Sequence, residues 1–257
     1  MSEGAIATGR LEGIRVGPWC AVIALGLMSA WLGLVGLGAL SAAGDLSGAL
    51  ATARAHSAGP ALFAFVAVVL LAERLWPAVE RPLLARAHIV DAAYLVLFAA
   101  VVLPLLTLVQ TGFAVEVARH AGFLIVSRLG ALPQVAVVVV ILIAIDGMNW
   151  AAHLANHRSL ALWRLHALHH SQEDMSVLTT FRTHPHVLAS YLPALVPALL
   201  LGSSGAVPEA AVIAYACLVT LSHANQRWSF GPLARVIVSP AYHRLHHAEV
   251  PGDGGAR

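Results

Sequence analysis

The chain of 257 residues contains little charge, only two cysteines and no lysine. Charged residues make up 11% of the sequence and the net charge is +2, which argues against a nucleic-acid-binding surface. Cys20 and Cys217 lie in apolar runs without metal-ligand spacing, so neither a disulfide scaffold nor a zinc ribbon is expected. The composition is therefore that of an apolar protein with few polar residues.

Long apolar runs fill most of the sequence: 59% of the residues are hydrophobic and the mean hydropathy is +0.78, far above the range of soluble domains. A helix needs about 20 apolar residues to cross a bilayer. The candidate spans are residues 18–40, 60–76, 89–110, 132–150, 187–202 and 206–222. The amphipathic stretch 113–126 is expected on the outer surface. These runs predict an all-α integral membrane protein with about four to six transmembrane helices.

The arginines indicate how the chain is oriented. With the N-terminus inside and six crossings, twelve arginines fall on the inner side, whereas only Arg54, Arg119 and Arg128 fall on the outer side. Under the positive-inside rule this bias places the polar segments 151–186 and 223–257 together in the cytosol. We therefore expect a bacterial inner-membrane protein with a cytosolic cap. Residues 1–257 are expected to form one membrane domain. Its N-terminal part, residues 1–130, is expected to consist of transmembrane helices, and residues 131–257 form a histidine-rich region.

Histidine is concentrated in that cap, since 11 of the 14 histidines follow residue 150. Residues i, i+3 and i+4 of a helix share one side, so closely spaced histidines can offer their ring nitrogens together. Neutral imidazole suits iron, zinc, copper and nickel, and eight clustered imidazoles exceed the four ligands of a structural zinc site. Two metal ions fit this number better than one. The pattern comprises HxxxH and two copies of HxxHH, formed by His153, His157, His166, His169, His170, His243, His246 and His247.

These motifs resemble the fatty acid hydroxylase and sterol desaturase superfamily. The resemblance extends from Asp146 to His247 and includes Phe181-Arg-Thr-His-Pro185, Ser222-His-Ala-Asn225 and Ser239-Pro240 before the last HxxHH. It implies a di-iron centre ligated almost wholly by histidine, O2 as co-substrate and a lipid substrate. Electrons would come from a separate donor, a ferredoxin or a cytochrome b5-like protein with its reductase.

The resemblance also assigns residues. It places the three histidine boxes on the eight clustered histidines, and it adds His223 and, with a weaker match, His184 as ligands. Leu154 stands where relatives usually have arginine, and relatives continue beyond the last box, so the chain is expected to be truncated. Apart from the resemblance, Asp146 lies two helical turns before His153, where its carboxylate could accept a hydrogen bond from a ligand imidazole.

The expected activity is an O2-dependent hydroxylation or desaturation of a sterol, hopanoid, fatty acyl or related lipid. A carotenoid-type hydroxylase of the related histidine-box class stays open as an alternative, as does a non-enzymatic histidine-rich membrane protein that binds or transports metal. Metal transporters tend to place ionisable residues at the bilayer midplane, whereas the middles of these apolar runs have none. A b-type cytochrome needs single histidines on facing helices, which adjacent pairs such as His169 and His170 do not provide.

Overall fold

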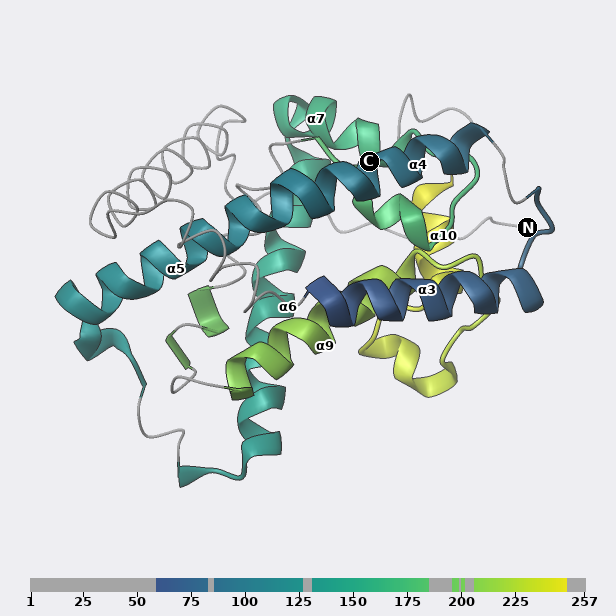
Figure 1. Ribbon diagram of the computed structural model, residues 1–257. Helices are drawn as coiled ribbons and strands as arrows, with labels where there is room; N and C mark the ends of the chain where they lie inside the picture. Colours follow the sequence, from purple (N-terminus) through teal and green to yellow (C-terminus); the bar gives the residue numbers. More distant parts are fainter. Residues whose placement is uncertain are drawn as a thin grey trace, which may run out of the picture.

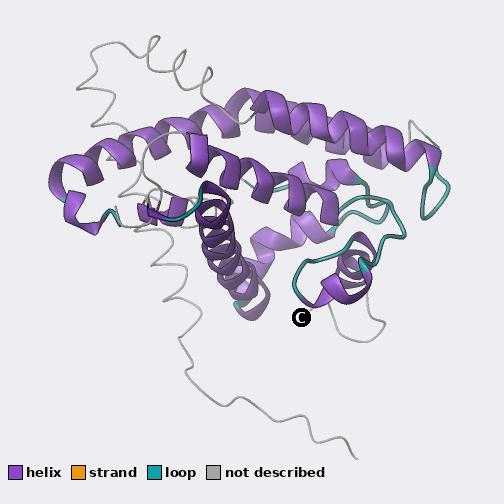
Figure 2. Cartoon of the chain, turned by 90° about the horizontal axis from the view of Figure 1, so that it is seen from below, coloured by secondary structure: helices purple, strands orange, loops and turns teal. Residues whose placement is uncertain are grey.

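The computed structural model describes residues 59–82, 86–126, 131–184, 196–198, 200–201 and 206–248. Throughout those residues the secondary structure is helical, without a strand (Figures 1 and 2). The elements are α3 (Gly59–Leu75), α4 (Arg86–Leu97), the π-helix η1 (Phe98–Val102), α5 (Leu103–His120), η2 (Gly122–Leu124), α6 (Gln134–Arg158), α7 (Leu160–His170), η4 (Val177–Phe181), α9 (Ala206–Ser222), η5 (Gly231–Arg235) and α10 (Pro240–His247). The described part of the chain therefore has the all-α architecture expected from its sequence.

The helices α4, η1 and α5 follow one another as one continuous run (Figure 1). Pro104 offers no N–H to the carbonyl of Ala100 four residues earlier, and its ring crowds that carbonyl. The wider π turn directly before Pro104 accommodates this conflict without ending the helix. Consequently α5 continues to His120, so the first part of the segment 113–126 is the end of a long helical run. The candidate span in this run ends at Val109, and the placement of 113–126 on the outer surface stays a prediction.

Within the part of the chain that the structure describes, two helical segments are long and apolar enough to cross a membrane, Ala87–Val109 and Gln134–Arg158. Only 11% and 17% of their most apolar windows are buried within the protein. The core helix of a soluble protein hides its apolar side chains, whereas Val96, Val135 and Ile143 are between 66% and 75% exposed. Apolar side chains turned outward over such lengths are typical of lipid-facing helices. This agrees with a membrane protein.

The remaining expected spans have different outcomes. The helix α3 covers the run 60–76 and α9 covers 206–222, but each has 17 residues. The run 18–40 lies outside the described residues, as does most of the run 187–202. The helix α6 extends eight residues beyond the predicted end of the 132–150 run, to Arg158. The first two histidines of the pattern thus lie on the last turns of the apolar helix itself.

Two apolar clusters hold these helices together. In one, Ile141 and Ile145 of α6 pack against Ala211 and Tyr215 of α9. In the other, Leu62, Val66 and Val69 of α3 pack with Phe98 and Val102 of η1, with Val177, Leu178 and Phe181 of η4, and with Ala224. The second cluster places η4 and the chain following α9 against the N-terminal helices. It therefore anchors two segments that adjoin the histidines.

A buried carboxylate joins α4 to the segment that follows α7. The side chain of Asp91 is fully buried, and its Oδ1 accepts a hydrogen bond from Arg182 Nη1 at 3.1 Å. Its Oδ2 accepts from Gln172 Nε2 at 2.5 Å and from Thr179 Oγ1 at 3.1 Å. These three hydrogen bonds offset the cost of burying the carboxylate. Asp91 thereby fixes the course of residues 172–182.

We predict from this contact that Asp91→Ala lowers the stability of the purified protein in detergent. Removing one partner of a buried ion pair leaves the other uncompensated and typically costs about 3–5 kcal/mol. A thermal unfolding series measures the effect, with Glu80→Ala as a control because Glu80 is exposed. An unchanged unfolding temperature for Asp91→Ala would show that the network is not needed for the fold.

The two ends of α6 provide a test of orientation. We predict that Leu132→Cys, just before α6, reacts with a membrane-impermeant maleimide in intact cells. Ser171→Cys, in the turn after α7, should react only after permeabilisation. Both side chains are exposed, and both variants are made in a background without Cys20 and Cys217. Labelling of both positions from the same side would contradict a membrane-spanning α6.

Candidate metal centre

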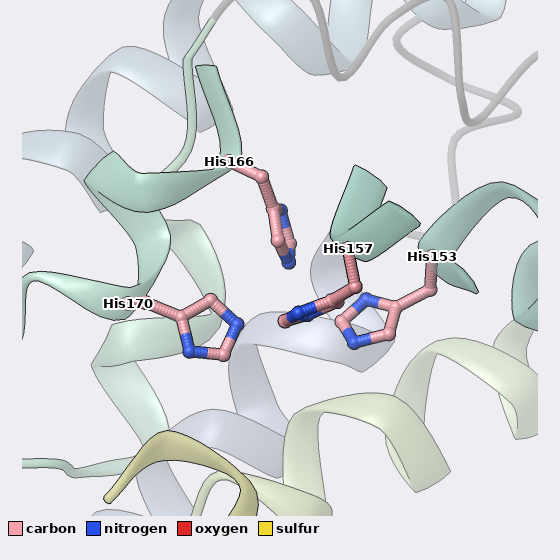
Figure 3. Close-up of side chains that lie close together, drawn as sticks. All are labelled: His153, His157, His166 and His170. Atoms are coloured by element: carbon pink, nitrogen blue, oxygen red, sulfur yellow. The ribbon is translucent and has the colours of Figure 1, made fainter. Parts of the chain in front are cut away.

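Four histidines from α6 and α7 form one compact set, here called set A: His153, His157, His166 and His170. Arg158 ends α6 and Leu160 begins α7, so only Ser159 separates the two helices. The hydroxyl of Ser159 caps α7 by accepting a hydrogen bond from Leu162 N at 3.5 Å. The potential ligand atoms of set A lie within 4.8 Å of one another. Figure 3 shows the four rings turned towards a shared space between the helices.

A second set of four, set B, comes from three elements: His169 of α7, His223 after α9, and His243 and His247 of α10. Their potential ligand atoms also lie within 4.8 Å of one another. The Nε2 atom of His223 is 3.1 Å from that of His169 and 3.0 Å from that of His243, and the latter is 3.2 Å from His247 Nε2. Four ring nitrogens thus meet at one point.

The HxxHH spacing explains how two sets arise from the same helices. In α7 the i, i+4 pair His166 and His170 belongs to set A, whereas His169 between them belongs to set B. In α10 the i, i+4 pair His243 and His247 belongs to set B. Its intermediate His246 instead brings its Nε2 to 2.9 Å from that of His153. The HxxHH motif of α7 therefore contributes to both sets, whereas that of α10 contributes two members to set B and places His246 beside set A.

The sets adjoin each other. The rings of His170 in set A and His247 in set B are stacked with their centroids 4.2 Å apart. His246 lies beside set A, with its ring centroid 4.7 Å from that of His157 and 4.9 Å from that of His170. Together with His246, the two sets make a single cluster of nine imidazoles. Such neighbouring sets have the arrangement needed for two metal ions close to each other.

The hydrogen bonding of set B fits a metal ligand role. His223 Nδ1 lies 2.8 Å from the carbonyl oxygen of Val219, which can only accept, so Nδ1 carries the proton and Nε2 a lone pair. That lone pair faces two further Nε2 atoms rather than a donor of another kind. Nitrogens bound to one ion at about 2.0–2.1 Å lie roughly 3.0–3.4 Å apart, as these do. A carbonyl that fixes the tautomer of a histidine is also the usual support of a ligand.

Set A contains buried nitrogens that find no hydrogen bond. The Nε2 atoms of His166 and His170 are buried without a hydrogen-bond partner in the described part of the chain. Buried polar atoms are nearly always satisfied, so these atoms require another partner. A bound cation would supply one. Trp163 packs beside this set, with its ring centroid 5.2 Å from those of His157 and His170, and shields them from one side.

Burial keeps the imidazoles of set B in the neutral form that binds metal. Burial lowers the pKa of His223 to about 4, and it lowers the pKa of His169 and His243 well below the usual value. Burial also lowers the pKa of His247, and the neighbouring imidazoles add to the shift. These rings are therefore neutral at pH 7, with a lone pair available for a ligand bond.

Two residues predicted for the site lie outside the cluster. His184 is exposed, follows η4, and belongs to neither set. Asp146 is an exposed residue of α6, and no hydrogen bond joins it to a ligand histidine among the described residues. Their roles stay predictions.

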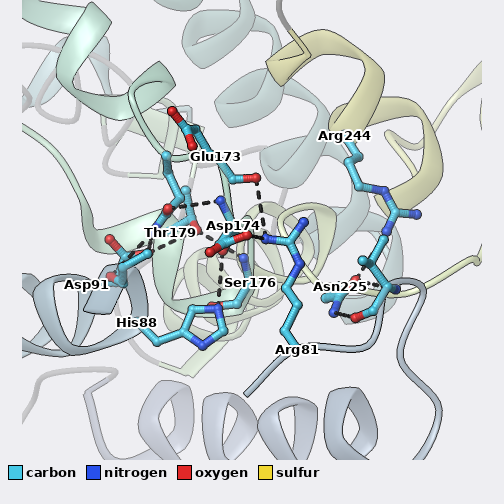
Figure 4. Close-up of polar contacts among 12 residues, drawn as sticks. Arg81, His88, Asp91, Glu173, Asp174, Ser176, Thr179, Asn225 and Arg244 are labelled. Atoms are coloured by element: carbon cyan, nitrogen blue, oxygen red, sulfur yellow. Dashed lines mark hydrogen bonds and ion pairs between the residues drawn. The ribbon is translucent and has the colours of Figure 1, made fainter. Parts of the chain in front are cut away.

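Polar contacts surround the cluster, and two of their carboxylates, Glu73 and Asp91, were not singled out from the sequence. Arg81 pairs with Asp174, His88 Nε2 lies 3.2 Å from the carbonyl oxygen of Asp174, and Asn225 contacts Arg244 (Figure 4). Glu73 and Asp91 also belong to this surround. The available signal was an ionisable residue inside an apolar run, which both of these carboxylates represent.

Comparisons with known proteins agree with this geometry. Residues 138–254 match the model of the fatty acid hydroxylase family. Over 119 residues the chain is 36% identical to ornithine lipid hydroxylase OlsE of Rhizobium tropici, a match that covers 46% of this chain and 36% of that protein. The aligned region is thus about a third of the relative's length. No solved structure matches the chain.

Both histidine sets lie inside the region that matches the family model. The named relative is a hydroxylase. Over residues 138–254, the chain is therefore similar to the fatty acid hydroxylase family.

Proposed function

We propose that the protein is a membrane lipid hydroxylase that holds two iron ions, one in each histidine set, and uses O2 as oxidant. The observation that carries the proposal is the division of the cluster into set A and set B, each with four converging imidazoles. Iron bound there would supply the activation of O2 needed to oxidise an unactivated C–H bond. Zinc would suit the same ligands but has no redox chemistry.

The protein's own residues prepare this chemistry. Burial keeps the imidazoles of set B neutral, and the carbonyl of Val219 orients the ring of His223. The ring of Trp163 covers one side of set A. The site lies at the end of the apolar helix α6, where a lipid chain can approach from the bilayer without passing through water. Excluding water protects a strong oxidant from side reactions.

Hydroxylation requires a balanced supply of electrons. One oxygen atom of O2 enters the C–H bond of the lipid to give an alcohol, and the other leaves as water after two electrons and two protons are added. The protein has no bound redox group of its own in this proposal beyond the metal pair. The electrons would come from a separate donor, a ferredoxin or a cytochrome b5-like protein with its reductase. The arginine bias supports a cytosolic encounter with such a donor.

The comparisons favour hydroxylation over desaturation, because the matching family and the named relative are both hydroxylases. The relative's substrate, an ornithine lipid, favours a polar membrane lipid over a sterol for this chain. The test is lipid profiling of a host with the gene intact and with the gene disrupted. The proposal expects a lipid that carries one additional oxygen atom and disappears on disruption. Identical lipid profiles in the two strains, under aerobic growth and with the gene expressed, would refute it.

Metal content provides the first biochemical prediction. The protein purified in detergent from iron-replete cells should contain about two metal ions per chain, because the ligands form two sets. Elemental analysis measures this value and identifies the metal. A content near zero would refute the metal centre, and stoichiometric haem would refute the di-iron assignment.

Replacing single histidine ligands provides a second biochemical prediction. His169→Ala and His246→Ala should abolish turnover while the protein still inserts, since lipid-embedded helices rather than these rings stabilise the fold. Asp146→Asn should cost less, about 10 to 100-fold, as is typical for a residue that supports a ligand. His120→Ala, at the exposed end of α5, is the matched control and should change activity only a few-fold. Parental turnover in both ligand variants at normal expression would show that these histidines do not bind the metal.

A further inference from the structure

The two histidine sets are assembled in different ways. Set A comes from α6 and α7, which are consecutive helices separated by Ser159 alone, so local chain geometry brings its members together. Set B combines α7, the turn after α9 and α10, which are far apart in the sequence. Its geometry must depend on contacts that tie these three segments to one another.

Glu73 makes two such contacts with a single oxygen atom. It lies in the last turns of α3, and its side chain is buried at 9% exposure. Its Oε1 accepts a hydrogen bond from the backbone N–H of Val177 at 2.7 Å and from that of Asn225 at 2.7 Å. Val177 begins η4, in the segment that continues from α7, and Asn225 is two residues after His223. One carboxylate therefore bridges the chain beyond His169 and the turn that carries His223.

Asn225 extends this bridge to the third segment. Its Oδ1 accepts from Arg244 Nη1 at 3.2 Å, and Arg244 Nη2 donates to the carbonyl of Gln226 at 2.9 Å (Figure 4). Arg244 adjoins His243 on α10. The side chain of Asn225 also pairs with both backbone groups of Val79, at 3.1 and 2.8 Å. The hydrogen bonds that begin at Glu73 thus reach the turn that carries His223, the helix α10 and, on the side of α7, the following segment at η4.

We infer that Glu73 is the positioning residue of set B: it touches none of the four rings and fixes their relative places through the backbone of Val177 and Asn225. Its position in α3 lies outside the region that matches the family model. The inference rests on the proposed function, in which each histidine set holds one metal ion. It assigns to the N-terminal helices a share in building one half of the centre.

The inference is specific enough to be tested by counting metal ions. Glu73→Ala removes both hydrogen bonds and should lower the metal content from about two ions per chain to about one, because set A is assembled without Glu73. Glu73→Gln keeps an oxygen in the place of Oε1 and should retain about two ions per chain. Glu80→Ala removes an exposed carboxylate from the loop after α3 and should also retain about two ions per chain.

Elemental analysis of the four detergent-purified proteins, including the parent, gives the metal content, and size-exclusion chromatography confirms that each is folded. If Glu73→Ala is not recovered folded, Glu73→Asp replaces it, since it withdraws the carboxylate by one methylene. The same expectation then applies. Three results would overturn the inference. Glu73→Ala, or Glu73→Asp in its place, could retain two ions per chain or lose both. Glu73→Gln could lose as much metal as Glu73→Ala. A parent without metal would instead refute the proposed function, and the inference with it.

Discussion

The structure depends on nine imidazoles sharing one buried volume. Two positive charges about 5 Å apart repel each other by about 3 kcal/mol even at an effective dielectric constant of 20. Protonation of several rings would therefore force the helices of the cluster apart. The rings are therefore neutral, and their nitrogen lone pairs converge on two points. His223 Nδ1 carries the proton and donates it in a hydrogen bond to the carbonyl of Val219, so Nε2 of the same ring has no proton to donate to its neighbours. A pair of cations would balance this arrangement.

The rest of the molecule divides into parts that serve this cluster differently. The helices α4, α5 and α6 turn apolar side chains outward, as expected next to lipid chains. Inside, polar side chains from α3 and α4 reach the segments that follow the histidine helices, as the contacts of Glu73 and Asp91 show. The matched family region contains all the converging histidines, yet part of its support comes from the N-terminal helices. An isolated fragment of residues 138–254 would lack these carboxylates.

The pairing of His153 with His157, of His166 with His170 and of His243 with His247 could be predicted from the sequence, because i and i+4 positions share one face of a helix. The all-helical architecture followed equally from the long apolar runs. The assignment of His169 to set B and the position of His246 beside set A could not be predicted, since they depend on how α10 packs against the rest of the cluster. The continuity of α5 with α4 could not be predicted either, because local amphipathicity does not reveal that the π turn before Pro104 lets the helix continue. Glu73 and Asp91 were missed because their partners lie between 81 and 152 residues away along the chain.

The single residue between α6 and α7 has an evolutionary consequence. With only Ser159 as a connection, one inserted or deleted residue between His157 and His166 would rotate the second helix by about 100° relative to the first, because an α-helix has 3.6 residues per turn. All four rings of set A would lose their common target. The chain between His170 and His223 is under no such restriction, since side-chain contacts rather than a short turn define where its ends lie. Length variation among homologues should therefore concentrate between the second box and His223, whereas the spacing between the first two boxes should stay constant.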